Sequence, residues 1–307
     1  MIPRLVGIGT HVPPRRVSNL DRMHDLGLDE AFVVDKLGVR QHARKEDGEG
    51  TVDLCVKAVA DLAVRQALPL AHIDLLCVVT QNPDRRIPHA AATLHDRLGL
   101  ARHCMTFDIS QGCAGFTHGL DIVTAVMRQR GLQHALLLTC DPYSTIVDPA
   151  DRNTALLFGD AATASYLCDE GPGWTLRDTD AGTRPGTSAC LQCDDHLRMD
   201  GRAVLMNAAH EVPASVERLL RRQGLALADI DTFLFHPGSL RILELLRSTL
   251  DVDAARAPFD ILDYGNTVSS SIPLMLSTRF AARPGVKRVL SGFGVGFSWA
   301  TSLIESI

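Results

Sequence analysis

The chain has 307 residues, 46% of them hydrophobic and 22% charged, a composition typical of a globular protein long enough for two domains of ~150 residues. Its net charge of −5 excludes a bulk electrostatic attraction to nucleic acid or to acidic membranes. The start of the chain lacks a basic leader followed by a long apolar segment, and no apolar run approaches the ~20 residues of a membrane span. Eight cysteines, mostly inside apolar runs, fit a reducing compartment. We therefore expect a cytoplasmic protein that binds neither nucleic acid nor membrane.

Apolar, strand-like segments alternate with amphipathic ones, which predicts an α/β protein with largely parallel strands. In chain order the sequence predicts a strand over residues 2–9, a helical segment over 19–38, a helix over 51–67, a strand over 73–80, a helix over 89–98 and a strand over 135–139. Thr51 is the predicted N-cap of the first long helix, and Gly99 ends the next one.

Residues 106–116 pass from a strand-like run through a tight turn into a helical pattern. Cys113 lies in the turn between the predicted strand and the predicted helix. There the free amide groups and the helix dipole favour thiolate over thiol. Gly112 and Gly115 remove side-chain bulk on either side, so a substrate could approach the sulfur. The alternative is a buried structural cysteine, because free cysteine is among the most buried residue types.

Three matches between the two halves of the chain indicate an internal repeat. Residues 68–74 resemble 225–231, the Phe-Asp-Ile of 107–109 recurs at 259–261, and 135–138 resemble 288–290. The same order and nearly constant spacing predict a duplicated α/β unit of about 150 residues. We accordingly predict two halves, 1–165 and 166–307.

The repeat predicts that three functional side chains lie together at the ends of the strands. Cys113 follows the Phe-Asp-Ile strand of the first half, and Asn266 follows its counterpart in the second half. His236 ends the strand that corresponds to 73–80. A pseudo-two-fold axis would bring these strand ends together, where α/β sheets usually place ligands. Taken singly, His236 could be a hydrogen-bonded core histidine and Asn266 a turn asparagine.

Motifs spread over nearly the whole chain point to one family. In order they are 111–116 (Gln-Gly-Cys-Ala-Gly-Phe), 158–162 (Phe-Gly-Asp-Ala-Ala), 199–201 (Met-Asp-Gly), His236 with Arg241, 264–267 (Tyr-Gly-Asn-Thr) and 292–296 (Gly-Phe-Gly-Val-Gly). With His236 and Asn266 30 positions apart, the sequence resembles the β-ketoacyl-acyl-carrier-protein synthase III family of condensing enzymes. The resemblance implies a thiolase-like αβαβα fold of five layers, built from two duplicated halves, and usually a homodimer.

The resemblance also implies a ping-pong acyltransferase reaction. Cys113 takes an acyl group from an acyl-coenzyme A or an acyl carrier protein, and a malonyl-type thioester then decarboxylates and attacks it. His236 and Asn266 would donate hydrogen bonds to the enolate-like oxygen, while the backbone amides of Cys113 and Val295 would form the other oxyanion site. No resident cofactor or metal is implied, and coenzyme A thioesters are substrates. The pathway would be fatty-acid-like or specialised, such as polyketide or quinolone synthesis.

Departures from the family pattern concern the residues expected to contact coenzyme A or carrier protein. Phe32 and Lys36 stand where the family has a Trp and an Arg against coenzyme A, and Ser239 stands where it has an Asn. We expect contacts to coenzyme A or carrier protein from Phe32, Lys36, Arg152 and Arg241. These differences favour a specialised pathway enzyme over a housekeeping fatty-acid initiator.

Two residue clusters have weaker interpretations. A predicted helix carries a basic cluster that could dock the acidic carrier protein or could be a solvated face: Arg218, Arg221 and Arg222. Cys190, Cys193 and His196 resemble half of a zinc site without a second ligand pair, so we expect no metal there.

Three other functions stay open from the sequence. The Cys113-bound acyl group could pass to a non-malonyl nucleophile, or it could be hydrolysed. The chain could also be a non-catalytic subunit of a heteromeric synthase, although it retains the cysteine whose loss would indicate that role.

Overall fold

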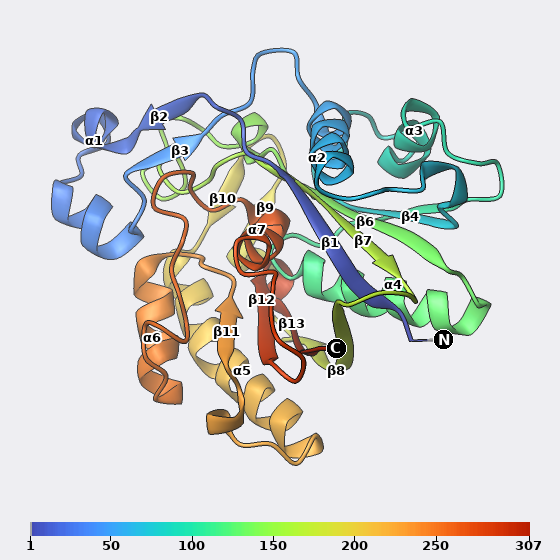
Figure 1. Cartoon of the computed structure of the whole chain (residues 1–307). Helices are drawn as coiled ribbons and strands as arrows, with labels where there is room; N and C mark the ends of the chain where they lie inside the picture. Colours follow the sequence, from blue (N-terminus) through green and yellow to red (C-terminus); the bar gives the residue numbers. More distant parts are fainter. Residues whose placement is uncertain (1) are drawn as a thin grey trace.

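A computed structural model describes residues 2–307 (Figure 1). Its strands are β1 (Arg4–His11), β2 (Arg16–Ser18), β3 (Gln41–Ala43), β4 (Leu75–Val79), β5 (Met105–Ile109), β6 (His134–Cys140), β7 (Ala162–Cys168), β8 (Trp174–Thr183), β9 (Leu191–Cys193), β10 (Leu197–Met199), β11 (Thr232–Phe235), β12 (Lys287–Gly294) and β13 (Ser298–Ser306). Its α-helices are α1 (Asn19–Arg22), α2 (Thr51–Arg65), α3 (Ala90–Arg97), α4 (Gly115–Arg130), α5 (Gly201–Arg222), α6 (Leu240–Leu250) and α7 (Ser271–Ser277).

The main sheet shows the duplication directly. Its nine strands run in the order β11-β12-β13-β8-β1-β7-β6-β4-β5. In the first half, β4 is parallel to β6, and antiparallel pairs then join β6 to β7 and β7 to β1. In the second half, β11, β12, β13 and β8 repeat this sequence of parallel and antiparallel pairs. The two half-sheets meet where β1 pairs with β8, with Leu5 opposite Trp174.

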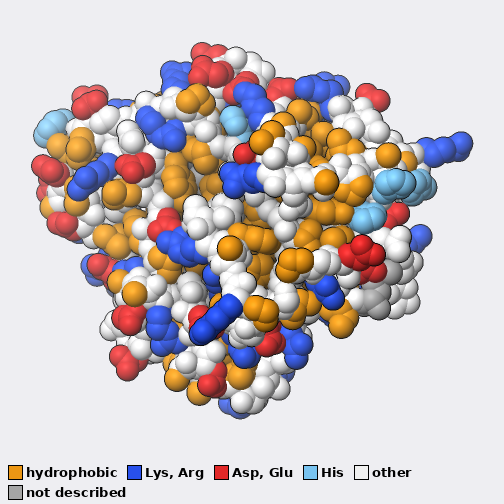
Figure 2. Space-filling view, viewed as in Figure 1, with side chains coloured by type: hydrophobic (Ala, Val, Ile, Leu, Met, Phe, Trp, Pro, Cys, Tyr) orange, Lys and Arg blue, Asp and Glu red, His pale blue; other side chains and the backbone are white. Residues whose placement is uncertain are grey.

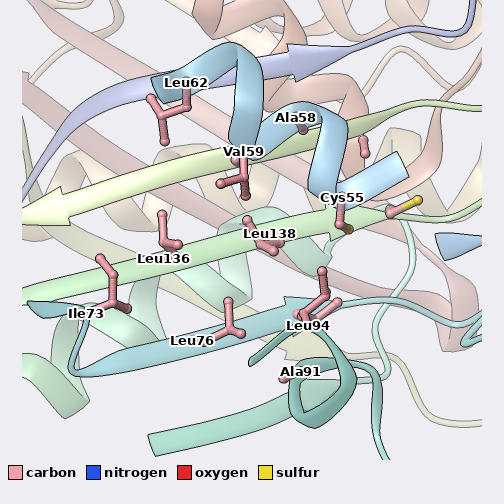
Figure 3. Close-up of a cluster of buried hydrophobic side chains, with 14 of the residues drawn as sticks. Cys55, Ala58, Val59, Leu62, Ile73, Leu76, Ala91, Leu94, Leu136 and Leu138 are labelled. Atoms are coloured by element: carbon pink, nitrogen blue, oxygen red, sulfur yellow. The ribbon is translucent and has the colours of Figure 1, made fainter. Parts of the chain in front are cut away.

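Helices cover the half-sheets in layers, which confirms the predicted αβαβα fold. Helices α2 and α3 pack on the outer face of the first half-sheet, and α5 packs on the outer face of the second with α6 beside it (Figure 1). Helices α4 and α7 contact strands of both halves and form the middle layer. Figure 3 shows part of the first outer core, where Val59 and Leu62 of α2 lie over Leu136 and Leu138 of β6. Burial of such apolar surface is the dominant favourable term in folding.

The strand predicted over 259–261 is wrong. These residues lie in a loop without ladder hydrogen bonds, so β5 has no hydrogen-bonded counterpart in the second half. The helical segment predicted over 19–38 is broken into α1, a 3₁₀ turn and a π-helix (Phe32–Leu37), because Gly27 and Gly38 adopt left-handed conformations that end their turns.

Two boundaries differ in detail from the prediction. The N-cap of α2 is Gly50 rather than Thr51, because the Asp84 carboxylate accepts from the amides of Thr51 and Val52 and caps the helix from another loop. The division predicted between residues 165 and 166 stays a prediction, and that point lies within β7.

Basic and acidic side chains are interspersed on the face shown in Figure 2. Within residues 2–307, no helix combines the length and the apolar character needed to cross a bilayer.

Candidate active site

The three predicted side chains line one cavity of about 250 Å³ at the ends of the strands. Cys113, His236 and Asn266 form its polar floor. Its walls are mainly apolar and include Leu157, Phe158, Leu191, Met199, Val204, Leu205, Ile242 and Phe293. A mostly apolar pocket with a few convergent polar groups is the usual form of a small-molecule site.

Cys113 lies in the turn between β5 and α4, where close backbone contacts leave room only for glycine. A Cβ on Gly294 would lie 3.2 Å from the Cys113 sulfur, and one on Gly292 would lie 2.6 Å from the Cys113 carbonyl oxygen. The turn that contains Val295 therefore presses against the cysteine turn, and Val295 packs on the hydrophobic cluster that includes Cys113. Glycine permits this approach because it has no side chain.

Burial changes the expectation for the thiol. Cys113 is 5% exposed, and burial, followed by the nearby Asp141 charge, raises the pKa of its thiol above the usual value. Desolvation therefore outweighs the expected preference for thiolate at the start of the helix, because burial penalises the charged form.

His236 follows β11 directly and is held by the backbone on both sides. Its amide donates to Ser291 at 2.8 Å, and its carbonyl accepts from Gly238 at 2.9 Å. The ring packs edge-on against Phe293, with centroids 5.7 Å apart. Burial lowers the pKa of His236 to about 3, so the ring is neutral throughout the physiological range.

Asn266 is fixed so that its NH₂ group faces the histidine. Its Oδ1 accepts from the Val268 amide at 2.9 Å, which leaves Nδ2 3.3 Å from His236 Nε2. The Asn266 amide donates to Leu157, and its carbonyl accepts from Gly159, both at 2.9 Å. Val268 has a φ of 54°, which is unfavourable for a β-branched residue, and such strain clusters at functional sites.

A buried carboxylate behind the cysteine was not predicted. Asp141 follows β6, accepts from the Gln81 amide at 2.6 Å and accepts from the Ser269 hydroxyl. Burial raises its pKa to about 6. Gln81 in turn accepts from the Tyr143 hydroxyl at 2.7 Å. The only signal in the sequence is an aspartate directly after an apolar strand, which gave no indication of its partners.

Comparisons with known proteins agree with this geometry. Residues 107–185 match the family model described as 3-oxoacyl-[acyl-carrier-protein] synthase III, and residues 220–306 match the model of its C-terminal part. The chain is 33% identical to β-ketoacyl-[acyl-carrier-protein] synthase III 2 of Streptomyces coelicolor, over 98% of this chain and 92% of that protein. The chain belongs to the β-ketoacyl-acyl-carrier-protein synthase III family. It is therefore a condensing acyltransferase.

Solved structures of the family superpose over almost the whole chain. The 3-oxoacyl-(acyl carrier protein) synthase III of Pseudomonas aeruginosa PAO1 is 31% identical with a TM-score of 0.92, covering 99% of this chain and 98% of that one. The priming β-ketosynthase from the R1128 polyketide biosynthetic pathway is 27% identical with a TM-score of 0.90, covering 99% and 96%. The predicted family and fold class are thus confirmed.

The residues expected to contact coenzyme A or carrier protein divide into two groups. Phe32 and Arg241 line the cavity, and the Lys36 ammonium lies 5.6 Å from the centre of the Phe32 ring, a cation–π contact. Arg152 is exposed, and the residue of its turn that lines the cavity is Asn153.

Ser239, at the position where an Asn was expected, caps α6. Its hydroxyl accepts from the Ile242 amide at 3.3 Å, which positions the first turn of α6. That turn carries Arg241 at the cavity.

The basic cluster on α5 is largely neutralised. Arg218 pairs with Asp180 at 2.8 Å, and Arg222 pairs with Asp178 and Asp180 at 3.0 and 2.9 Å. Only Arg221 makes no ion pair within residues 2–307. The three arginines lie at the C-terminal end of α5, whereas Val204 and Leu205 at its other end line the cavity. These ion pairs favour the solvated-face interpretation, and carrier docking at this cluster stays a prediction.

The two cysteines near β9 lie in different environments. Cys190 is buried in the core of the second half, whereas Cys193 is exposed. In residues 2–307, no group of three or more His, Cys, Asp or Glu side chains is arranged to hold a metal ion.

Proposed function

We propose that this chain forms an acyl thioester on Cys113 and condenses it with a malonyl-type thioester by decarboxylative Claisen condensation. The observation that carries the proposal is the shared apolar cavity, into which a thiol, a neutral imidazole and a carboxamide open together. The donors are positioned before substrate binds, which is the condition for electrostatic catalysis.

In the first half-reaction, the Cys113 thiol releases its proton to solvent as its sulfur attacks the acyl carbonyl carbon of the donor. The backbone amides of Cys113 and Val295 would stabilise the oxyanion. The C–S bond to coenzyme A then breaks, and the departing thiolate takes up a proton from solvent. The product is an acyl group on the Cys113 sulfur, with its chain in the apolar part of the cavity.

In the second half-reaction, His236 and Asn266 stabilise the decarboxylation. With the His236 proton on Nε2, this atom and Asn266 Nδ2 present two donors to one thioester oxygen. The bond between the α-carbon and the carboxylate breaks, carbon dioxide leaves, and the electron pair forms an enolate. The α-carbon attacks the acyl carbonyl, and Cys113 leaves as thiolate. No proton is removed by His236, which suits its low pKa.

The coenzyme A or carrier-protein part of the substrate would lie along Phe32, Lys36 and Arg241, with Arg152 outside the cavity. Acyl-coenzyme A or acyl carrier protein would supply the acyl group, and no resident cofactor is needed. The pathway is fatty-acid-like or specialised, and the likeness to the R1128 priming ketosynthase supports a polyketide-type role. We place the enzyme in the cytoplasm, because all eight cysteines are unpaired.

The homodimer would form at the edge of the sheet. β5 has a single strand neighbour, β4, and exposes the apolar Met105, which is 39% exposed. An unpaired apolar edge strand favours association with another chain. A Met105→Lys variant should therefore sediment as a monomer where the wild type sediments as a dimer, and an unchanged dimer would exclude this interface.

Intact-protein mass spectrometry after incubation with a panel of acyl-coenzyme A thioesters tests the function. We expect a mass increase equal to one acyl group, absent in Cys113→Ala and retained in the control Cys193→Ala, which removes the exposed cysteine. Adding malonyl carrier protein to the acylated protein should give a β-ketoacyl product. Release of free acid would indicate a hydrolase, and transfer to another nucleophile without loss of carbon dioxide would indicate the other acyltransferase function.

A further inference from the structure

A second, smaller cavity of about 130 Å³ lies beside the active site and is not used by the proposed reaction. Its lining includes Arg22 at the end of α1, His42 of β3 and Arg44 just after β3. Ser144 and Phe158 also line it. Its volume is about half that of the catalytic cavity, so it fits one small group rather than a nucleotide.

Two arginines give this cavity a positive lining, and the nearby Asp160 carboxylate is paired with neither of them. Neither Arg22 nor Arg44 forms a salt bridge within residues 2–307. Arg22 donates one N–H to the Pro149 carbonyl at 2.8 Å, which leaves other guanidinium donors free. The carboxylate of Asp160, beside Ser144, already accepts from the amides of Lys45 and Ser144 and from the Ser144 hydroxyl. Two arginines without a carboxylate partner favour an anion.

His42 adds an acceptor to these donors. Asn19 Nδ2 donates to the carbonyls of Val39 and Leu156, so its Oδ1 must accept from His42 Nδ1, 2.9 Å away. The proton therefore sits on Nδ1, and the lone pair is on Nε2, which makes no hydrogen bond with residues 2–307. Burial and the two arginines lower the pKa of His42 to about 4, which keeps the ring neutral near pH 7.

We propose that the cavity bounded by Arg22, His42 and Arg44 binds hydrogen phosphate, free or as the end of a small phosphomonoester. The arginines donate to the ionised oxygens, and the remaining P–O–H group donates to His42 Nε2. A sulfate ion has the same shape but carries no proton near neutral pH, so it cannot make the last bond. The site thus discriminates by one hydrogen bond, which is an effective basis for specificity.

This anion site adjoins the catalytic cavity through a shared wall. Phe158 lines both cavities. The backbone of Leu157 and Gly159, on either side of Phe158, holds Asn266 by two hydrogen bonds. A Cβ on Gly265 would lie 3.0 Å from His42 Cβ, so His42 also packs directly against the turn that presents Asn266.

Isothermal titration at pH 6 and constant ionic strength tests the site, with inorganic phosphate, methyl phosphate and sulfate as probes. We expect one saturable phosphate site, with sulfate binding at least about tenfold weaker, because sulfate lacks one hydrogen bond to the site. Arg22→Gln and Arg44→Gln should each weaken phosphate binding about tenfold or more, and the control Arg221→Gln on α5 should leave it unchanged. Binding of methyl phosphate as well indicates a phosphomonoester, whereas binding of inorganic phosphate alone indicates the free ion.

Four results would overturn the proposal: no saturable binding, equal binding of sulfate, unchanged binding in the two arginine variants, or displacement of phosphate by coenzyme A. The last result would assign the phosphate to the coenzyme A site instead. None of these measurements depends on acylation of Cys113, so they test the anion site independently of the proposed reaction.

Discussion

Replacement of Asp141 by Asn should remove a pH-dependent cost from the folded state. Burial raises the pKa of Asp141 from 3.8 to about 6, so the folded chain holds this proton more tightly than the unfolded chain does. Stability is therefore lost as pH rises from about 4 to 6 and stays lost above that range. At 1.36 kcal/mol for each pKa unit, the whole effect is about 3 kcal/mol, of which about 1.4 kcal/mol falls between pH 5 and 7.5.

The amide can keep the hydrogen bonds of the carboxylate. Asn at position 141 can accept from the Gln81 amide with its oxygen and donate to the Ser269 hydroxyl with its nitrogen, because a hydroxyl can do either. The variant should therefore gain stability relative to wild type as the pH rises. Loss of the Asp141 charge should also lower the pKa of Cys113 and speed its alkylation by iodoacetamide at pH 8.

Urea unfolding of both proteins between pH 5 and 7.5 measures this difference. The gap in unfolding free energy, variant minus wild type, should increase by about 1.4 kcal/mol over that range. Asp47→Asn is the matched control for the same change of residue type at the surface, since the Asp47 side chain is 97% exposed. Parallel pH profiles for Asp141→Asn and wild type would refute the raised pKa.

Three further substitutions test individual contacts. Gly294→Ala places a methyl group 3.2 Å from the Cys113 sulfur and should slow acylation at least about tenfold, with unchanged circular dichroism; acylation at the wild-type rate would show that the approach to sulfur is open. Ser239→Ala removes the cap on the Ile242 amide and should cost about 1 kcal/mol of stability in urea unfolding; no change would mean that the cap is replaced by water. Arg241→Glu should raise the KM for the carrier-protein substrate more than that for coenzyme A thioesters, because the carrier is acidic, and this difference should shrink at high salt; equal changes would remove Arg241 from carrier binding.

The sequence predicted the main features of the site because its residues follow strongly patterned strands. β4 and β6 are continuous apolar runs, as expected of strands buried on both faces. The repeat aligned β11 with β4, which brought His236 to the floor of the cavity. Asn266 was predicted in the same way, although the strand assumed before it does not form.

Contacts between distant parts of the chain could not be read from the pattern. Asp141 and Ser269 are 128 residues apart, and nothing in either local sequence indicates their hydrogen bond. The pairing of Arg218 with Asp180 likewise depends on α5 packing against β8 and neutralises an apparently free basic cluster. The raised pKa of Cys113 depends on burial from several segments, whereas the sequence revealed only the favourable helix start.

Separation of the two half-reactions tests the central claim most directly. Wild type, His236→Ala, Asn266→Ala and the exposed-residue control His210→Ala are first acylated, and then mixed with malonyl carrier protein in a single turnover. If Cys113, His236 and Asn266 serve one thioester as proposed, all four proteins acylate at similar rates, while His236→Ala and Asn266→Ala condense at least about 100-fold more slowly than wild type. Condensation at the wild-type rate in either variant, or an equal loss of acylation, would contradict the account.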